Sequence, residues 1–258
     1  MTTLGFMTVA LGDKYEQFVA PYIASTLLTY PEATTEIRVN APGKWREKHK
    51  KLASKLTALF GDRYRVAKVT YPWRKRRLIP NSVRFVIRPE LSRPDLLYIG
   101  DVDIMISAAD LVTFHTQAMT DLKLPYSNII RPGTNRLTGL HAVATEAYYA
   151  KITPAAVEVA VKRWGKGNDE KLLYHLCRTN IGLPKKVVQR PVFGIHASPQ
   201  RPALETVGLP CHWGIPLHFQ DHIKLTARPE WQELAPLFTA PFQKRLSQVD
   251  TWIQKHRE

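Results

Sequence analysis

The sequence predicts an α/β fold in which helices flank a mostly parallel sheet. In the first third of the 258 residues, short apolar segments alternate with amphipathic helical segments, which is typical of parallel strands joined by covering helices. Further along, the continuous apolar run 96–99 (Leu-Leu-Tyr-Ile) is typical of a strand buried on both faces. A hydrophobic content of 44% is ordinary for a globular chain, and this length is sufficient for one large core.

The elements of the first third follow from hydrophobic periodicity. Apolar residues recur at helical spacing in two segments, and three short apolar or alternating segments separate them. In order, the predicted elements are a strand at 5–11, a helix from Tyr15 to the residues before Pro31, a strand at 35–39, a basic amphipathic helix at 45–60 capped by Gly61, and a strand at 65–70.

The rest of the chain has fewer regular patterns and is richer in His, Pro and Trp. Residues 107–116 are apolar but mixed, and 125–132 is predicted as a loop. The remaining predicted elements are a helix at 83–87, the central strand at 96–99, a strand at 139–144, an amphipathic helix at 154–164, a helix from Asn168 or Asp169 through Arg178, a strand ending at His196, and a polar helical segment from Trp231 onward.

An Asp-Val-Asp triplet follows the central strand. Asp101 and Asp103 stand where ligands bind in open α/β sheets, and Gly100 allows a close backbone approach. In extended geometry both carboxylates point to one side, which suits a hard divalent cation that also takes phosphate oxygens. A surface turn with two solvated aspartates is the alternative interpretation.

The chain is strongly basic, with a net charge of +15 and a pI of about 9.9. This predicts an anionic partner: nucleotide phosphates, nucleic acid or an anionic membrane surface. Four consecutive basic residues at 74–77, beside Tyr71 and Trp73, are either such a contact or a solvated loop. Arg84 lies in an apolar segment and requires an anionic partner because it cannot deprotonate.

Two further positions are candidates for chemistry. Asp169 and Glu170 follow Asn168 at an expected helix start, so they are either capping residues or a catalytic carboxylate, and both interpretations stay open. His196 ends an apolar strand soon after a glycine, whereas the spacing of the other late histidines matches no compact zinc motif.

Composition also excludes some classes. Two cysteines provide neither a disulfide framework nor a zinc cluster, which favours a reducing, cytoplasmic compartment. No apolar run approaches ~20 residues, so no transmembrane helix is expected, and the first residues do not have the pattern of a signal peptide.

Several segments together resemble GT-A-fold glycosyltransferases, with the retaining families eight and six as the nearest likeness. They are 10–15 (Ala-Leu-Gly-Asp-Lys-Tyr), 84–91 with its arginine, 95–103 with the D-x-D triplet, 168–173 (Asn-Asp-Glu-Lys-Leu-Leu) and 194–196 (Gly-Ile-His). The likeness covers about the first two-thirds of the chain.

The resemblance implies a metal-dependent glycosyltransferase that moves a sugar from a nucleotide-sugar, a UDP-sugar in these families, to a glycan or glycolipid acceptor with retention. It implies a GT-A-like catalytic domain at 1–225, with a nucleotide-binding half at 1–106 and an acceptor and catalytic half at 107–225, followed by a helical tail at 226–258. We expect peripheral contact with the inner face of an anionic membrane, and we expect no specific nucleic-acid partner.

The resemblance also assigns roles. Tyr15 would stack on the base, Arg84 would contact the donor, and Asp169 or Glu170 would face the anomeric carbon. Asp101, Asp103 and His196 would hold Mn²⁺ or Mg²⁺. The implied donor-binding residues are Ala10, Tyr15, Arg84, Asp101, Val102 and Asp103.

Two other classes compete with this interpretation. One is a nucleic-acid-binding protein that uses the basic residues 74–77. The other is a nucleotidyltransferase or nuclease that uses Asp101 and Asp103 with two metals. Tyr15 and the position of the triplet after a strand favour the transferase, and spacing identifies no third acidic ligand for a nuclease.

Overall fold

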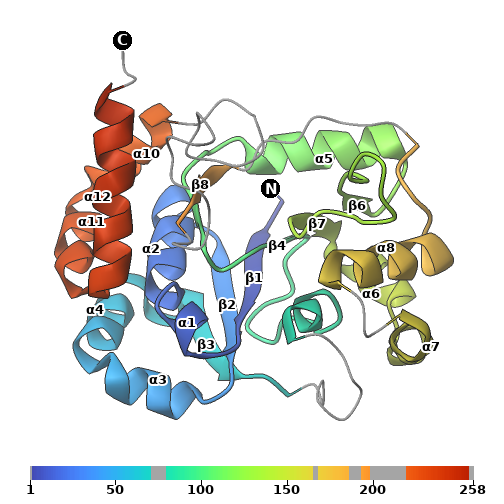
Figure 1. Ribbon diagram of the computed structural model, residues 1–258, viewed down its shortest axis with the longest axis horizontal. Helices are drawn as coiled ribbons and strands as arrows, with labels where there is room; N and C mark the ends of the chain where they lie inside the picture. The colour runs from blue at the N-terminus through green and yellow to red at the C-terminus, as the bar shows by residue number, and fades with distance from the viewer. Residues whose placement is uncertain (1, 71–79, 165–167, 186–192, 198–218, 256–258) are drawn as a thin grey trace.

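The computed structural model describes residues 2–70, 80–164, 168–185, 193–197 and 219–255 (Figure 1). Its strands form one six-stranded sheet and one two-stranded ribbon. The sheet contains β1 (Leu4–Ala10), β2 (Thr34–Val39), β3 (Tyr64–Lys68), β4 (Leu96–Ile99), β6 (Tyr126–Ser127) and β7 (His141–Ala144), and the ribbon contains β5 (Ile104–Ile106) and β8 (Gly194–His196).

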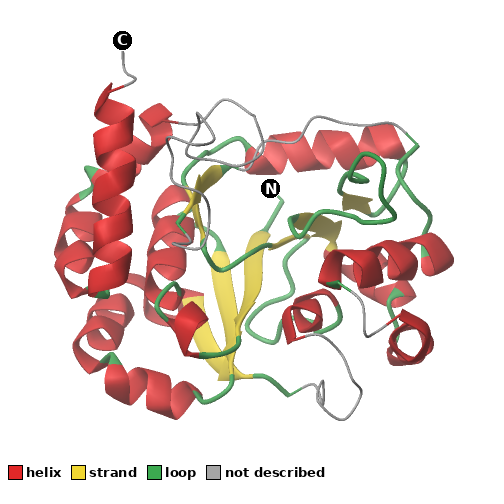
Figure 2. Ribbon diagram, in the orientation of Figure 1, coloured by secondary structure: helices red, strands yellow, loops and turns green. Residues whose placement is uncertain are grey.

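Helices lie on both sides of the sheet (Figure 2). The α-helices are α1 (Asp13–Glu16), α2 (Val19–Thr29), α3 (Pro42–Lys48), α4 (Lys50–Phe60), α5 (Leu111–Leu122), α6 (Thr145–Lys151), α7 (Pro154–Trp164), α8 (Asp169–Asn180), α10 (Phe219–Thr226), α11 (Pro229–Leu234) and α12 (Ala240–Lys255). Short 3₁₀ helices are η1 (Gly61–Arg63), η2 (Pro80–Phe85) and η3 (Ala235–Leu237).

The strand order confirms the predicted fold class. The order is β3-β2-β1-β4-β7-β6; the first four strands are mutually parallel, and β7 and β6 are antiparallel to their neighbours. Because β1 and β4 are adjacent and parallel, with Met7 opposite Ile99, their carboxyl ends meet at one edge. The triplet and the segment that leads into α1 therefore start from the same edge of the sheet.

Successive residues of the central strands point to opposite faces and supply two separate cores. Phe6 and Tyr98 belong to the first core cluster, which α2, α4 and the C-terminal helices cover. Met7 and Ile99 belong to the second core cluster, which η2, α7 and α8 cover. Each such fully buried side chain contributes roughly 1.5–3 kcal/mol, so burial on both faces fixes the register of the central strands.

The C-terminal helices belong to the first core cluster. Trp231 of α11 and Phe242 of α12 are buried in it together with residues of α2 and α4. The domain limit placed between residues 225 and 226 falls at the last residue of α10. That division of the chain stays a prediction.

Two predicted helices are interrupted in the structure. The helix from Tyr15 is two helices, since Phe18 donates its backbone N–H to the Tyr15 carbonyl, only three residues back, before α2 begins. The helix at 45–60 is divided at His49, whose φ of −115° and ψ of 32° are not helical. The segment at 83–87 is not an α-helix, because η2 ends at Phe85 with 3₁₀ geometry.

Several elements were missed, including β5, α6 and α10 as well as α5 and β6. Helix α5 begins within the mixed segment 107–116. The sequence pattern does not reveal it, because one of its buried positions is a polar residue, His115, which interrupts the apolar periodicity. Strand β6 lies inside the predicted loop 125–132 and is only two residues long, so periodicity does not reveal it. The helix at 154–164 and the cap Gly61 are confirmed.

Several positions from the sequence analysis lie outside the described residues. They are the basic segment 71–77 and two of the late histidines, His212 and His218. In the part of the chain that the structure describes, no helix has the length and apolar character needed to cross a bilayer.

Candidate functional site

The Asp-Val-Asp triplet forms a turn at the end of β4. The N–H of Ile104 donates to the Asp101 carbonyl (3.2 Å), so the prediction that the triplet is extended is wrong. The Gly100 carbonyl accepts from the buried Thr8 hydroxyl (2.8 Å), which ties the turn to β1. The side chain of Asp103 is 12% exposed and that of Asp101 33%, so neither carboxylate is freely solvated.

Arg84 connects two acidic segments that are distant in sequence. Its side chain is 3% exposed, and Nη2 lies 2.8 Å from Oδ1 of Asp101 and 3.2 Å from Oδ2 of Asp169. Burial alone would lower the pKa of Arg84. The negative charges of Asp101 and Asp169 raise it by more than burial lowers it, so the net shift is upward. Arg84 therefore stays charged between two carboxylates, which supplies the anionic partner that the sequence requires.

Gly139 leaves room for this ion pair. A Cβ atom built on Gly139 would lie 2.8 Å from Nη2 of Arg84 and 3.2 Å from Oδ2 of Asp101. Any side chain here would push the guanidinium or the carboxylate aside. The sequence places Gly139 only in a strand, and its role depends on contacts between distant segments that one sequence does not reveal.

The start of α8 matches the predicted helix cap. The Asn168 side chain accepts the N–H of Glu170 (2.8 Å), so Asn168 is the N-cap residue. Asp169 and Glu170 occupy the first turn, where the helix dipole favours negative charge. Capping and a chemical role are compatible, because the cap uses the Asn168 side chain and the Glu170 backbone N–H and involves neither carboxylate.

The two acidic residues at this helix start contact different cations. Asp169 contacts Arg84, whereas Oε1 of Glu170 accepts from Arg131 (2.5 Å) and from the backbone N–H of Gly139 (3.2 Å). The Glu170 carbonyl also accepts the N–H of Leu137 (3.2 Å). Burial raises the pKa of Glu170, and Arg131 offsets part of this rise.

His196 lies beside the triplet, as predicted. It pairs with Ile104 across the β5–β8 ribbon, and its Nε2 lies 3.7 Å from Oδ2 of Asp103. The N–H of Ala197 donates to the Asp103 carbonyl (2.7 Å). The ribbon therefore positions a buried imidazole next to the second carboxylate of the triplet.

These residues provide a set of metal ligands that fits a hard divalent cation only in part. Two carboxylates and an imidazole are suitable ligands for Mn²⁺ or Mg²⁺. Among the described residues, however, no three His, Cys, Asp or Glu side chains form a group that could hold a metal ion together. Asp101 and Asp103 suit a cation that takes its other ligands from water and phosphate, and the assignment of His196 as a third ligand stays a prediction.

The residues expected at the nucleotide lie near the same edge of the sheet. Ala10 is buried at the end of β1, and Val102 is buried in the turn. Tyr15 of α1 packs against the first core cluster, with the Lys14 amine 4.7 Å from the centre of its ring. The Trp45 indole N–H donates to the Glu16 carbonyl (3.4 Å), which anchors α1 to α3.

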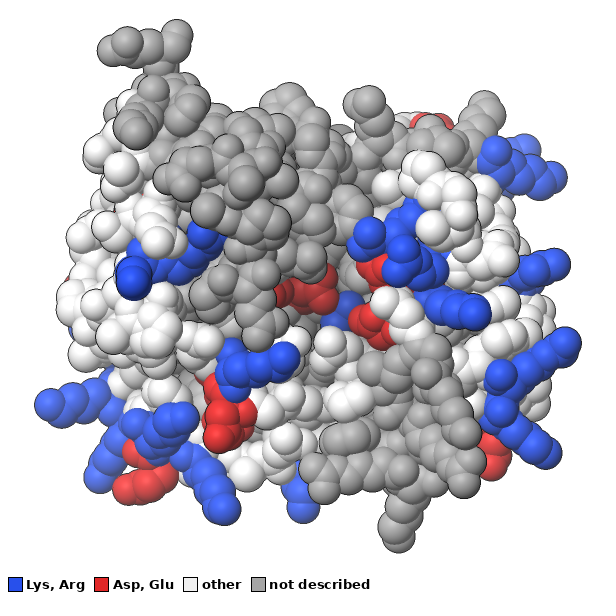
Figure 3. Space-filling view, viewed as in Figure 1, with Lys and Arg blue, Asp and Glu red and all other residues white. Residues whose placement is uncertain are grey.

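The structure thus brings together Arg84, Asp101 and Asp169, and places His196 beside Asp103. Figure 3 shows acidic and basic side chains next to one another near the centre of one face of the molecule. Arg131 and Gly139 were not identified as site residues from the sequence. A basic residue in a predicted loop gives no signal of its partner, and Arg131 is recognised only through its contact with Glu170.

Comparison with known proteins finds a distant structural likeness. No protein-family model matches the chain, and no curated protein matches it. A solved structure, the mannosyltransferase PcManGT from Pyrobaculum calidifontis in complex with GDP-Man and Mn²⁺, is similar at 11% sequence identity and a TM-score of 0.40, with 98% of this chain and 73% of that chain covered. A likeness this distant establishes neither family nor function.

Proposed function

We propose that this chain is a metal-dependent glycosyltransferase that uses a nucleotide-sugar donor. The observation that carries the proposal is the gathering of Asp101, Asp169 and the buried Arg84 at the carboxyl edge of β1 and β4. This edge is where open α/β sheets bind nucleotides. Donor diphosphates require fixed positive charge, and the cation that accompanies them requires carboxylates.

We propose that several residues at the carboxyl edge of β1 and β4 bind the nucleotide-sugar donor together. Asp101 and Asp103 would hold Mn²⁺ or Mg²⁺, which as a Lewis acid stabilises the charge on the leaving diphosphate. Arg84 would contact the donor through a guanidinium nitrogen other than Nη2, which the two aspartates contact. Tyr15 would stack on the base, with the backbone of Ala10 and Val102 lining the nucleotide.

Asp169 is the residue proposed at the reacting centre. It shares Arg84 with Asp101, which supports a position beside the proposed diphosphate site, and it stands at the positive end of α8. An ionised carboxylate there would stabilise the positive charge that develops on the anomeric carbon. Glu170, held by Arg131 and the Gly139 N–H, is proposed as a positioning residue that orients Asp169.

The proposed sugar transfer needs only the donor and the acceptor. The bond between the anomeric carbon and the diphosphate oxygen breaks, and its electron pair leaves with the diphosphate. An acceptor hydroxyl oxygen bonds to the same carbon, and its proton passes to the departing diphosphate. The proposed donor is a UDP-sugar, the proposed acceptor a glycan or glycolipid, and the proposed outcome retention.

Donor hydrolysis is the direct test. The whole chain would be incubated with UDP- and GDP-sugars, with and without Mn²⁺, and released nucleotide measured. We expect Mn²⁺-dependent release from one donor, and a loss of at least about 100-fold in kcat with little change in KM for Asp169→Ala, since its contribution arises in the transition state. The exposed Asp62→Asn serves as control; parent turnover in Asp169→Ala would contradict the assignment.

A further inference from the structure

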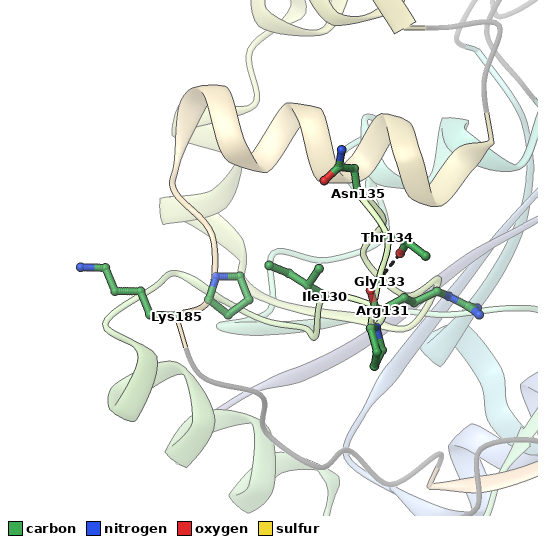
Figure 4. Close-up of a pocket in the computed structure, with 8 residues that line it drawn as sticks. Ile130, Arg131, Gly133, Thr134, Asn135 and Lys185 are labelled. Carbon is green, nitrogen blue, oxygen red and sulfur yellow. Dashed lines mark hydrogen bonds between the residues drawn. The ribbon is translucent and has the colours of Figure 1, made fainter.

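Figure 4 shows in close-up the residues that line a cavity of about 450 Å³, and one of them, Arg131, contacts Glu170. Its volume falls within the range of roughly 300–1,000 Å³ typical of small-molecule sites. Two segments line it, residues 130–135 and residues 184–185.

The first segment belongs to a hairpin at 130–137 with a defined backbone. Ile130 and Leu137 form an antiparallel bridge, and Arg131 donates its N–H to the Arg136 carbonyl (2.9 Å). Within the turn, the Thr134 hydroxyl donates to the Arg131 carbonyl (2.9 Å). The cavity wall is therefore a structured turn whose backbone and Thr134 side chain are held by hydrogen bonds.

Arg131 links this cavity to the reaction centre. It lines the cavity, and its guanidinium binds Glu170, the neighbour of Asp169. Leu137 of the same hairpin donates to the Glu170 carbonyl. The side chain of Arg131 therefore connects the cavity to Glu170, the neighbour of the carboxylate proposed to face the donor sugar.

The lining favours a polar ligand with negative charge. Of the described residues that line the cavity, none is acidic, two are cationic (Arg131 and Lys185), and Thr134 and Asn135 add hydrogen-bonding groups. Figure 4 shows the side chains of Arg131 and Lys185 extending in opposite directions. Because Arg131 is already paired with Glu170, the exposed Lys185 is the lining cation suited to an anion, and it lies on the side away from the Arg131 guanidinium.

From this lining we infer that the cavity is the acceptor subsite and that the acceptor is a sugar carrying a phosphate or carboxylate group. The inference rests on the proposed function. The acceptor hydroxyl lies toward Asp169, with the hairpin end of the cavity holding the sugar ring. The anionic group lies at Lys185, so this lysine sets acceptor specificity and takes no part in donor binding.

Calorimetry without metal or donor tests this on the whole chain with three probes: glucose 6-phosphate, glucuronate and methyl glucoside. We expect one or both anionic sugars to bind at least about tenfold more tightly than methyl glucoside. Lys185→Ala should reduce this preference to within about twofold, Lys185→Arg should keep it, and the exposed Lys151→Ala on α6 serves as matched control.

Equal affinity for all three probes would overturn the inference, and so would an anion preference that persists in Lys185→Ala. Preference for only one anionic sugar would identify the group, phosphate or carboxylate. The proposed function is judged separately by Mn²⁺-dependent donor hydrolysis, which Lys185→Ala should retain. A chain that hydrolyses donor but shows no anion preference would contradict only the acceptor inference.

Discussion

At the scale of single residues, Arg84 organises the candidate site. A buried guanidinium is stable only when anions surround it, and Asp101 and Asp169 supply them from distant segments. The sequence predicts that Arg84 has an anionic partner, because its apolar neighbours and permanent charge require one. It does not identify the partners, since they are brought together only by the packing of η2 against β1 and α8.

Gly139→Ala should disrupt this arrangement. The added methyl group would meet Nη2 of Arg84 at 2.8 Å, so the ion pair with Asp101 must shift. We expect a loss of roughly 1–3 kcal/mol in the free energy of unfolding, as for other overpacking substitutions, and at least about tenfold weaker nucleotide binding. Gly43→Ala on α3 is the matched control, because nothing lies within 4 Å of its Cβ position. Equal nucleotide affinity in the two variants would show that the Arg84 contact is dispensable.

Glu170 should make stability depend on pH. Burial raises its pKa above the ordinary value of 4.5, so the folded state binds this proton more tightly than the unfolded state. Its contribution to the free energy of unfolding is therefore largest at low pH and is lost as pH rises above about 4.5. Urea unfolding across this range should show a smaller decline with pH in Glu170→Gln than in the parent chain. Glu32→Gln, an exposed site, should follow the parent; identical profiles in all three would contradict the upward shift.

At the scale of elements, the helix start at α8 and the hairpin at 130–137 form one unit. The cap at Asn168 was predictable, because Asn before an acidic pair and an apolar pattern is a local signal. The different partners of Asp169 and Glu170 were not, because they depend on Arg84 and Arg131 from other segments. Likewise, strands buried on both faces were found from sequence, whereas β6 and the break at His49 have no local signal.

Asn168→Ala should weaken both stability and activity. Loss of the side-chain acceptor for the Glu170 N–H should cost about 1 kcal/mol in the free energy of unfolding. Because the first turn of α8 carries both carboxylates, donor turnover should fall more than stability alone explains. Asn180→Ala, which removes a side-chain hydrogen bond to the Leu176 carbonyl at the other end of α8, is the matched control. Circular dichroism melting and donor hydrolysis would be measured on each; unchanged turnover in Asn168→Ala would show that the cap does not orient Asp169.

At the scale of the whole molecule, the sheet separates two cores, and the candidate site lies where elements from both sides meet. β1 and β4 supply the edge, α8 and η2 approach from the second core cluster, and the triplet turn continues into β5, which belongs to the first. The sequence predicts this layered arrangement and the position of the triplet. It does not predict the turn geometry at Asp101, because the bond from Ile104 to the Asp101 carbonyl and the bond from Thr8 to the Gly100 carbonyl form only in the folded chain.

The most direct test of the central claim, metal-dependent nucleotide binding at the triplet, is calorimetric titration of the whole chain with UDP and GDP, with and without Mn²⁺. We predict that one nucleotide binds at least tenfold more tightly with Mn²⁺, and that Asp101→Asn and Asp103→Asn each remove this gain while Asp62→Asn keeps it. Equal affinity with and without Mn²⁺, or an unchanged gain in both triplet variants, would contradict the claim.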